Sequence, residues 1–433
     1  MKPCPFENLI RQKRKSATMT PFEPGVASDF YFACSNGDYQ RVLDYLNDEN
    51  GPGIEVLNEL QPNGSTALHA ATYRNHVEIV RLLLERGCPR TTLNRFGLFA
   101  YQEANTDEMQ TLYKRKTSTN RFHELEPETN LSIFIAAADA SSTDQQYPSY
   151  VEEFRTMQEV QQYSLHLQTK VMWLAVYHWF SQTFRTSIEP EHLRIDEFDL
   201  CNHADFQKFL TDNFSLEHRK TIMGHIASAK ARNSIEPLIT LYTGEEHGFY
   251  KVFNKALAKQ NRSEHKDSQL CDRFLMEFFL RRPELRQRSF TGVVFRGVTI
   301  HRESLDIYRR AADEKRLGIL SFKALTSTST NPSVAMKFFE NPVLDNDHIR
   351  VLFVFEINHV SSKIFNIADI SEYGRECEVI ILPGTLFSVE EIEENPQGQL
   401  IKIYLKQVHI SISVWQKLKN SYVAGQQSVL NKH

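Results

Sequence analysis

Cysteine is scarce in this chain of 433 residues, and no two cysteines are spaced as a C-x-x-C pair. The six cysteines are Cys4, Cys34, Cys88, Cys201, Cys271 and Cys377. Such scattered residues are typical of free thiols in a reducing compartment, and they argue against a disulfide framework or a zinc site. We therefore expect no metal ion in the protein.

The chain also lacks a hydrophobic run long enough to span a membrane. Its most apolar stretch, residues 171–180, is shorter than the roughly 20 residues that a spanning helix needs. Residues 1–20 are polar and do not resemble a secretory signal, and the last residues offer no apolar tail for a lipid anchor. We expect an intracellular protein without a membrane partner, in the cytoplasm. The nucleus is the alternative, because residues 11–15 are a short basic run that otherwise fits a solvated tail.

Neither sign of charge dominates, since 50 Lys and Arg stand against 54 Asp and Glu and give a net charge of −4. This balance argues against a dedicated nucleic-acid binder, so we expect no nucleic acid among the partners. Hydrophobic residues at 41% and charged residues at 24% are typical of a folded chain. The length allows two or three domains.

The chain does contain an internal repeat. Residues 32–46 align with residues 70–84, and a third, weaker copy covers 94–112. The segment Asn63 to His69 (NGSTALH) precedes the second copy and resembles the turn and first helix of ankyrin repeats, while Gly87 fits a helix cap. By this resemblance the histidine hydrogen-bonds turn backbone and is not a metal ligand. We expect a helical array that binds a protein partner.

The middle of the chain shows helical periodicity and no catalytic motif. Apolar residues recur at steps of three and four over residues 150–184, and a second helical group covers 205–229. We interpret this region as packing and spacing.

Two segments in the C-terminal half place polar residues in apolar strand patterns. Arg296 lies in the strand pattern of residues 291–299, and its permanent charge needs an anion there. That anion is either the phosphate of a ligand, whose approach Gly297 would permit, or a carboxylate of the core. Ser327 belongs to a run of hydroxyl residues over 322–331, which is also common in edge strands.

A pair of glutamates, Glu376 and Glu378, stands where a polar loop becomes an aliphatic run. In a strand, residues i and i+2 point to the same face, so we expect these carboxylates side by side and Cys377 on the other face. Carboxylates at the mouth of an apolar strand require a cation on that face, unless the strand simply begins with a solvated edge.

An Arg-Gly strand, a Ser-Thr-Ser strand and a Glu-x-Glu strand in this order resemble the arginine-specific mono-ADP-ribosyltransferases of the R-S-E class. The resemblance covers residues 238–412 and is most specific over 365–389. It departs at Leu325, where relatives usually carry an aromatic residue. The repeat and this resemblance together imply a multidomain α+β protein. It has N-terminal α-helical ankyrin repeats, a helical middle region and a C-terminal mixed α/β ADP-ribosyltransferase domain with two packed β-sheets.

Together the repeat and the resemblance predict five parts. These are a disordered leader (1–27), ankyrin repeats (28–115), a linker and helical region (116–230), an ADP-ribosyltransferase catalytic domain (231–412) and a C-terminal tail (413–433).

The resemblance implies the activity of an NAD(P)(+)–protein-arginine ADP-ribosyltransferase, which moves ADP-ribose from NAD to arginine and releases nicotinamide. NAD is the substrate, and no metal takes part. By the family's pattern Glu378 holds the ribose 2′-hydroxyl and stabilises an oxocarbenium-like transition state. Glu376 orients and deprotonates the acceptor guanidinium. Tyr373, in the loop before the pair, either contacts the acceptor protein or packs the loop.

The remaining site residues bind the cofactor substrate in the same pattern. Arg296, beside Gly297, clamps the NAD phosphates, and Ser327 hydrogen-bonds Glu378 and fixes its rotamer. Two other functions stay open, namely an NAD glycohydrolase that uses water and an inactive ankyrin scaffold. The sequence identifies neither the acceptor protein nor the partner of the repeats.

Overall fold

The computed structural model describes residues 25–48, 51–115, 151–154, 156–161, 204–232, 234–245, 247–258, 283–313, 318–338, 347–394 and 400–409. Most of the predicted leader, most of residues 116–203, the tail at 413–433 and Cys4, Cys201 and Cys271 lie outside these ranges.

The chain forms two compact units. The first, here the repeat unit, comprises Met1–Thr119, Ala204–Phe253 and Asn366–Val379. The second, the sheet unit, comprises Asn120–His203, Asn254–Phe365 and Ile380–His433. Each unit is therefore assembled from segments far apart in the sequence.

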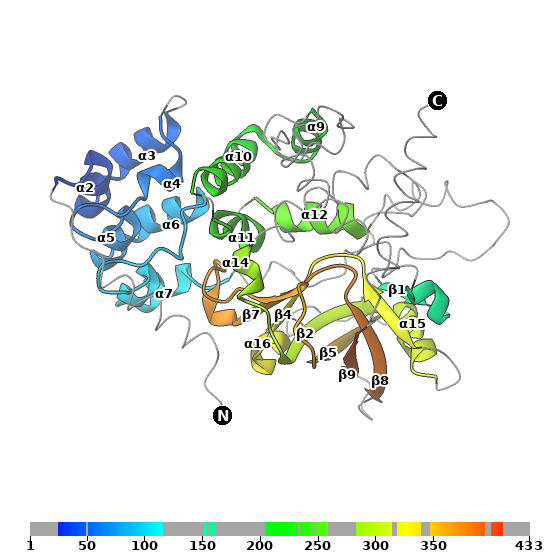
Figure 1. Cartoon of the computed structure of the whole chain (residues 1–433). Helices are drawn as coiled ribbons and strands as arrows, with labels where there is room; N and C mark the ends of the chain where they lie inside the picture. Colours follow the sequence, from blue (N-terminus) through cyan, green and yellow to red (C-terminus); the bar gives the residue numbers. More distant parts are fainter. Residues whose placement is uncertain are drawn as a thin grey trace, which may run out of the picture. The chain divides into compact units, whose positions relative to one another are not determined.

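The repeat unit starts with short helices arranged in pairs (Figure 1, blue to cyan). They are α2 (Asp29–Asn36), α3 (Tyr39–Asn47), α4 (Ile54–Leu57), α5 (Ala67–Tyr73), α6 (Val77–Glu85), the 3-10 turn η1 (Ala100–Glu103) and α7 (Asp107–Leu112). Side chains of Ser28, Asp38, Thr66 and Thr106 accept a hydrogen bond from a backbone N–H of the first turn of α2, α3, α5 and α7. These caps satisfy donors that a helix start leaves without partners, so the local sequence sets where each helix begins.

His69 joins neighbouring repeats. Its ring nitrogens lie 2.8 Å from Thr66 Oγ1 and 2.9 Å from the carbonyl oxygen of Leu98, and the residue is buried. The predicted structural role of this histidine is confirmed. Gly87 follows α6 with φ 78°, a left-handed conformation that suits a glycine cap, as predicted.

The burial of His69 predicts a pH-dependent stability of the array. Burial lowers the pKa of His69 to about 4, against the opposing effect of its bond to Leu98. The folded state disfavours the protonated ring. The stability that neutral His69 contributes is therefore complete above pH 6.5, the pKa of the unfolded state, and is lost as the pH falls toward 4. From this shift we expect the free energy of unfolding to fall by about 3 kcal/mol over that window.

The measurement is thermal or urea unfolding of the parent and of His69→Gln between pH 7.5 and pH 4. The difference in stability between the two proteins should shrink as the pH falls. A difference that is constant with pH would contradict the assignment.

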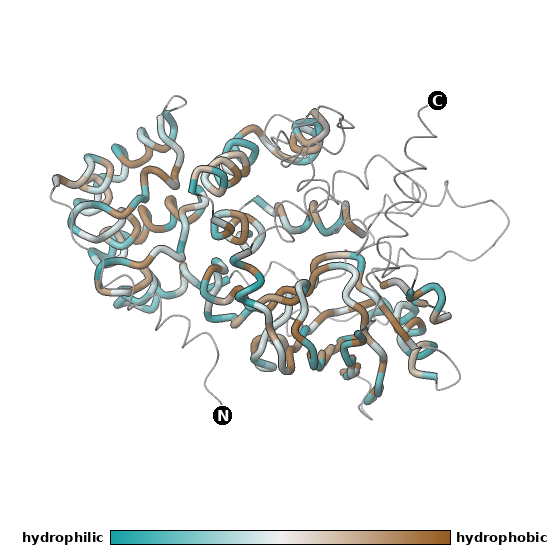
Figure 2. Tube along the Cα trace, viewed as in Figure 1, coloured by the Kyte–Doolittle hydropathy of each residue, from teal (hydrophilic) through white to brown (hydrophobic). Residues whose placement is uncertain are grey.

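The repeat unit continues in helices from the middle of the chain. These are α9 (Ala204–Asn213), α10 (Leu216–Ala231), α11 (Glu236–Thr243) and the first half of α12 (Phe249–Ala258). The predicted helical group at 205–229 is confirmed. Helix α10 contacts α4 and α11, and ion pairs join Arg86 to Glu217 and Arg232 to Glu59. Residues 237–243 of α11 are all buried, and the helix is largely hydrophobic in Figure 2.

The sheet unit is built on a mixed sheet of nine strands in the order β1-β3-β8-β9-β5-β2-β4-β7-β6. The strands are β1 (Val151–Phe154), β2 (Gly292–His301), β3 (Ile319–Phe322), β4 (Thr326–Ser329), β5 (His348–Ile357), β6 (Ile364–Asn366), β7 (Glu378–Ile381), β8 (Leu386–Glu394) and β9 (Leu400–Val408). Strands β5 and β9 run parallel, whereas β2 and β5 run antiparallel. The division between the two units falls within β6 and β7.

Short helices complete the sheet unit. They are α14 (Pro283–Arg286), η7 (Arg302–Ser304), α15 (Leu305–Ala311) and α16 (Pro332–Lys337). The core is aromatic and buried, with ring contacts among Tyr308, Phe322, Phe353, Phe355 and Phe387. In the parts of the chain that the structure describes, no helix is both long and apolar enough to cross a bilayer.

Two sequence-based expectations of the fold need correction. The first residues of the predicted helical segment 150–184 form strand β1, which pairs with β3 and buries Val151 and Phe154, whereas residues 162–184 lie outside the described ranges. The strands also form one hydrogen-bonded sheet where two packed sheets were expected. Phe295 of β2 faces Ser329 of β4, and this single residue pair joins β4, β7 and β6 to the other strands.

Candidate functional site

In the sheet unit, the structure brings together Arg296 and Ser327. Arg296 is half-buried in β2, and its Nη1 donates to the backbone carbonyl oxygen of Ser327 at 3.0 Å. Gly297 is buried and faces Leu352 across the β2–β5 register. Ser327 is 2% exposed, in a strand whose four residues are all buried. Arg296, the predicted phosphate clamp, is thus in direct contact with the backbone of Ser327.

Glu378 belongs to the repeat unit and opens strand β7. It is 2% exposed, and its Oε2 accepts a hydrogen bond of 2.9 Å from the hydroxyl of Ser371. A carboxylate held by a buried hydroxyl has a restricted rotamer, which is the positioning role that the sequence assigned to Ser327. The role of Ser327 toward Glu378 stays a prediction, whereas the contact of Ser371 was not anticipated.

Glu376 does not share a strand with Glu378, and this part of the prediction is wrong. Residues Gly374–Glu376 form the 3-10 turn η8, and Cys377 adopts a left-handed conformation with φ 50°. A left-handed residue interrupts the alternation of side chains along a strand, so the period of two begins only at Glu378. The two carboxylates are held by different partners as a result.

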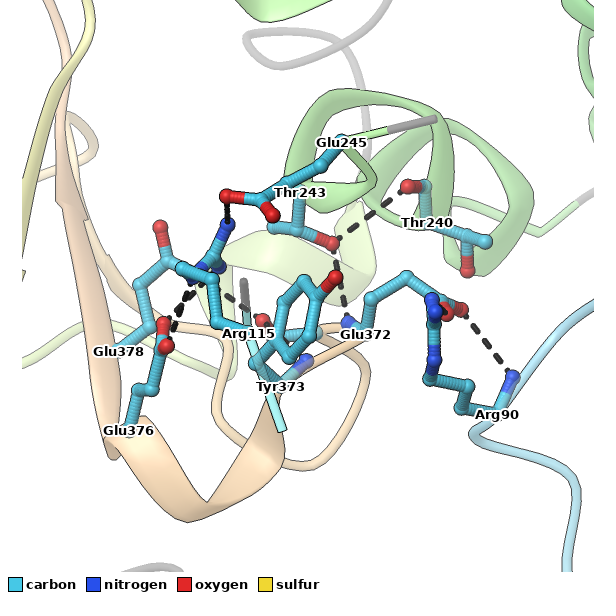
Figure 3. Close-up of polar contacts among 10 residues, drawn as sticks. Arg90, Arg115, Thr240, Thr243, Glu245, Glu372, Tyr373, Glu376 and Glu378 are labelled. Atoms are coloured by element: carbon cyan, nitrogen blue, oxygen red, sulfur yellow. Dashed lines mark hydrogen bonds and ion pairs between the residues drawn. The ribbon is translucent and has the colours of Figure 1, made fainter. Parts of the chain in front are cut away.

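The carboxylate of Glu376 binds the guanidinium of Arg115 with both oxygens (Figure 3). Arg115 Nε donates to Oε1 at 2.7 Å, and Nη2 donates to Oε2 at 2.9 Å. On the other side of the guanidinium, Nη1 donates to Glu245 Oε1 at 2.7 Å. The ring centroid of Tyr373 lies 3.8 Å from the central guanidinium carbon. Each nitrogen of the guanidinium therefore donates to a carboxylate oxygen, and one face of the group meets an aromatic ring.

The cluster is removed from solvent. Side-chain exposure is 7% for Arg115, 8% for Glu245 and 18% for Glu376. Burial alone opposes the charged guanidinium, but the carboxylates of Glu376 and Glu245 outweigh it and raise the pKa of Arg115. A fork of carboxylate oxygens, an excess of negative charge and a stacked ring are the features that bind a guanidinium in preference to an ammonium.

A second buried ion pair lies on the other side of Tyr373. Arg90 Nη1 donates to Glu372 Oε2 at 2.8 Å, with 7% and 3% of the two side chains exposed. The backbone N–H of Glu372 donates to Thr243 Oγ1 at 3.0 Å, as Figure 3 shows. The ion pair ties the loop of residues 366–379 to the segment that follows α6, and the bond to Thr243 ties the loop to α11.

Replacing Arg90 with alanine should destabilise the repeat unit strongly. The variant leaves Glu372 buried without its cation, a change that typically costs about 3–5 kcal/mol. Denaturant unfolding measures the loss, and a double variant with Arg90→Met and Glu372→Leu should recover most of it. A loss below about 1 kcal/mol for Arg90→Ala, typical of a solvated surface pair, would contradict the buried ion pair.

Three residues of the candidate site were not anticipated from the sequence, namely Arg115 and Glu245 of the cluster and Ser371, which binds Glu378. A signal existed for Glu245, which follows the apolar helix α11 directly and so enters a buried environment where a carboxylate needs a cation. Arg115 gave no signal, because it lies in the run Lys114-Arg115-Lys116 and resembles solvated linker charge.

The cysteines that the structure describes, Cys34, Cys88 and Cys377, are all buried. Burial raises the pKa of Cys34 to about 12, so its thiol is unreactive at neutral pH. Among the residues that the structure describes, no group of three or more His, Cys, Asp or Glu side chains is arranged to hold a metal ion.

Comparison with known proteins identifies the N-terminal array. A family model for ankyrin repeats, in three copies, matches residues 30–116. The predicted ankyrin repeats are thereby confirmed. The NAD-capped RNA hydrolase NUDT12 of Homo sapiens is 36% identical over 70 residues, which are 16% of this chain and 14% of that protein. The same values hold for the protein of Macaca fascicularis. The chain thus matches about a seventh of the length of these relatives.

Several solved structures, among them that of an ADP-ribosyltransferase, are distantly similar to the chain. The Vis toxin, an ADP-ribosyltransferase from Vibrio splendidus, is 18% identical with a TM-score of 0.30, over 53% of this chain and 91% of that one. The type III effector XopAI from Xanthomonas axonopodis pv. citri is 18% identical with a TM-score of 0.31, over 60% and 95% of the two chains. Exoenzyme S from Pseudomonas aeruginosa, in a complex bound to Carba-NAD, is 18% identical with a TM-score of 0.30, over 49% and 94%.

Proposed function

We infer that the chain is an NAD-dependent mono-ADP-ribosyltransferase that moves ADP-ribose to arginine side chains of proteins. One observation supports this most strongly. Glu376 and Tyr373, the residues that the sequence assigns to the acceptor, hold a guanidinium group in the folded chain. Two residues after Glu376 stands Glu378, a buried carboxylate fixed by Ser371. A guanidinium-binding carboxylate beside a second, immobilised carboxylate fits transfer to arginine.

In the proposed reaction, the bond between C1′ of the nicotinamide ribose and the ring nitrogen breaks, and nicotinamide leaves with the electron pair. A guanidino nitrogen of the acceptor supplies the pair for the new bond to C1′. The proton that this nitrogen loses passes to Glu376 and then to solvent. Glu378 stabilises the positive charge that develops on the ribose and holds the 2′-hydroxyl, as carboxylates do in glycoside hydrolysis.

The other site residues serve the NAD molecule. Arg296 supplies a charged fork for the pyrophosphate, and Gly297 and Ser327 complete that end of the site. Ser371 acts as a positioning residue for Glu378. The ankyrin array is the part that recruits a protein partner, in keeping with the surfaces that such repeats offer.

Arginine is the acceptor that the cluster favours. Glu376 offers two oxygens to the two parallel N–H groups of a guanidinium, whereas the ammonium of lysine presents a point charge with no fixed plane. The ring of Tyr373 adds a stacking surface that a planar cation uses best.

The test is incubation of the purified chain with NAD labelled in its adenylate half, beside polyarginine and polylysine of equal length. Because the side chain of Arg115 binds the carboxylate of Glu376, the variant Arg115→Ala is assayed in parallel. We expect label on polyarginine and little on polylysine. Nicotinamide release without labelled polymer would instead make the protein an NAD glycohydrolase, and no release from either protein would make it a scaffold.

A further inference from the structure

Arg115 binds the two residues that the proposed function assigns to the acceptor arginine, Glu376 and Tyr373. It makes the bidentate contact with Glu376, the contact with Glu245 and the ring contact with Tyr373. These are all the polar and aromatic elements of the guanidinium cluster. A guanidinium from another protein therefore finds the cluster filled by a residue of the chain itself.

The location of Arg115 in the sequence is as informative as its contacts. It lies three residues after α7, the last helix of the ankyrin array, and 261 residues before Glu376. An arginine of a polar linker is ordinarily solvated, because burial of a charge costs several kcal/mol. Here the side chain is 7% exposed, and the carboxylates that it binds are those of Glu245 and Glu376. Ordinary surface ion pairs of this unit, such as Arg86 with Glu217, leave their glutamate 67% exposed.

The neighbouring pair of Arg90 and Glu372 shows what a purely structural contact looks like in the same loop. Glu372 is 3% exposed, and its backbone is anchored to Thr243. Glu376 is more open at 18% and belongs to a 3-10 turn between Tyr373 and Cys377. The carboxylate of Glu376 is thus more accessible to a second guanidinium than that of Glu372.

We propose that Glu245, Glu376 and Tyr373 form the subsite for the acceptor guanidinium, and that Arg115 is an internal pseudosubstrate which fills it. This inference rests on the proposed function and specifies its acceptor subsite and its control. Glu245 becomes a specificity-determining residue, since it adds a second carboxylate on the far edge of the guanidinium. Transfer to a protein requires that the segment after the array withdraw Arg115.

The strength of the block follows from tethering. A group held near its site by a short connection competes at an effective concentration of about 1 mM or more. A free guanidino compound must compete with Arg115. Its apparent affinity equals its intrinsic affinity multiplied by the fraction of time that the subsite is vacant. Removing the Arg115 side chain should lower the KM of a small acceptor by about tenfold or more.

The experiment compares the parent, Arg115→Ala and Lys114→Ala, with Lys114 as the adjacent exposed cation. Agmatine carries one guanidino group, and putrescine is the matched diamine without it. Two readouts are taken, namely label transfer from NAD to agmatine, and the shift of Tm that each compound produces without NAD. We expect a lower KM and an agmatine-specific rise of Tm in Arg115→Ala, and neither change in Lys114→Ala.

The outcomes separate the inference from the function on which it rests. If Arg115→Ala and the parent label agmatine with equal KM, the transferase stands and the pseudosubstrate is wrong. If agmatine stabilises Arg115→Ala but no protein turns over NAD, the subsite stands and the transferase is wrong. If the parent labels Arg115 itself, that residue is a substrate and the pseudosubstrate is overturned.

A loss of folding in Arg115→Ala would not leave the question open. Arg115→Lys keeps a cation between the two carboxylates but cannot form the fork, so it should fold and show the same changes in smaller measure. An Arg115→Lys protein that folds and has the KM of the parent would overturn the inference.

Discussion

Glu378→Ala is expected to abolish both nicotinamide release and ADP-ribose transfer, with a loss of about 10²–10³-fold or more. The reason is electrostatic. The charge that develops on the ribose in the transition state needs a fixed anion, and Glu378 is buried and already oriented by Ser371. A group that is positioned before the reaction acts without reorganisation, so its removal affects the rate more than substrate binding.

The measurement is kcat and KM for nicotinamide release and for transfer, in the parent and the Arg115→Ala background. Glu391→Ala is the matched control, because Glu391 is exposed on β8. We expect kcat to fall and KM for NAD to change little in Glu378→Ala. Activity within about threefold of the parent would remove Glu378 from the proposed chemistry.

Glu376→Gln is expected to separate ADP-ribose transfer to arginine from nicotinamide release, and this is the second large effect. The amide keeps the shape of the side chain but loses the charge and one of the two acceptor oxygens that hold a guanidinium. Transfer to arginine should fall by about 10²–10⁴-fold, the range for loss of a general base. Nicotinamide release should persist, because water needs no guanidinium subsite.

Both products are quantified in one reaction, so the ratio of transferred to released ADP-ribose is the readout. A fall of both products in parallel would place Glu376 in the ribose chemistry and not at the acceptor. Transfer at the parental rate would show that arginine recognition does not depend on this carboxylate.

The repeats and several strands could be predicted because their signals are local. Thr66 and His69 stand three residues apart, and cap and turn bonds act over that distance. Gly87 is a cap because its neighbours end a helix. The apolar run around Arg296 similarly predicts β2, since such a run is a property of successive residues.

The acceptor cluster could not be predicted in full, because it depends on one backbone torsion and on distant partners. The left-handed Cys377 separates Glu376 from the strand of Glu378, and non-glycine residues adopt this conformation too rarely for a sequence pattern to show it. Arg115 and Glu376 are 261 residues apart, and Arg115 and Glu245 are 130 apart. Only the tertiary fold brings such groups together.

The ankyrin array lies in the same compact unit as Glu376 and Glu245. The array, the loop of residues 366–379 and helix α11 belong to one compact unit. Under the proposed function, a partner that binds the array would act close to Arg115, which lies three residues after α7, and through it on the proposed acceptor subsite. In this proposal the ankyrin array, which binds the partner, and Arg115, which fills the subsite, belong to one continuous segment of the chain.

The central claim is transfer of ADP-ribose to arginine, and mass spectrometry of an acceptor tests it most directly. A peptide with one arginine and one lysine is incubated with NAD and Arg115→Ala, and fragmentation locates the added group. We expect ADP-ribose on the arginine, and none when Glu378→Ala is added in the same background. An unmodified peptide beside released nicotinamide, or ADP-ribose on the lysine, would contradict it.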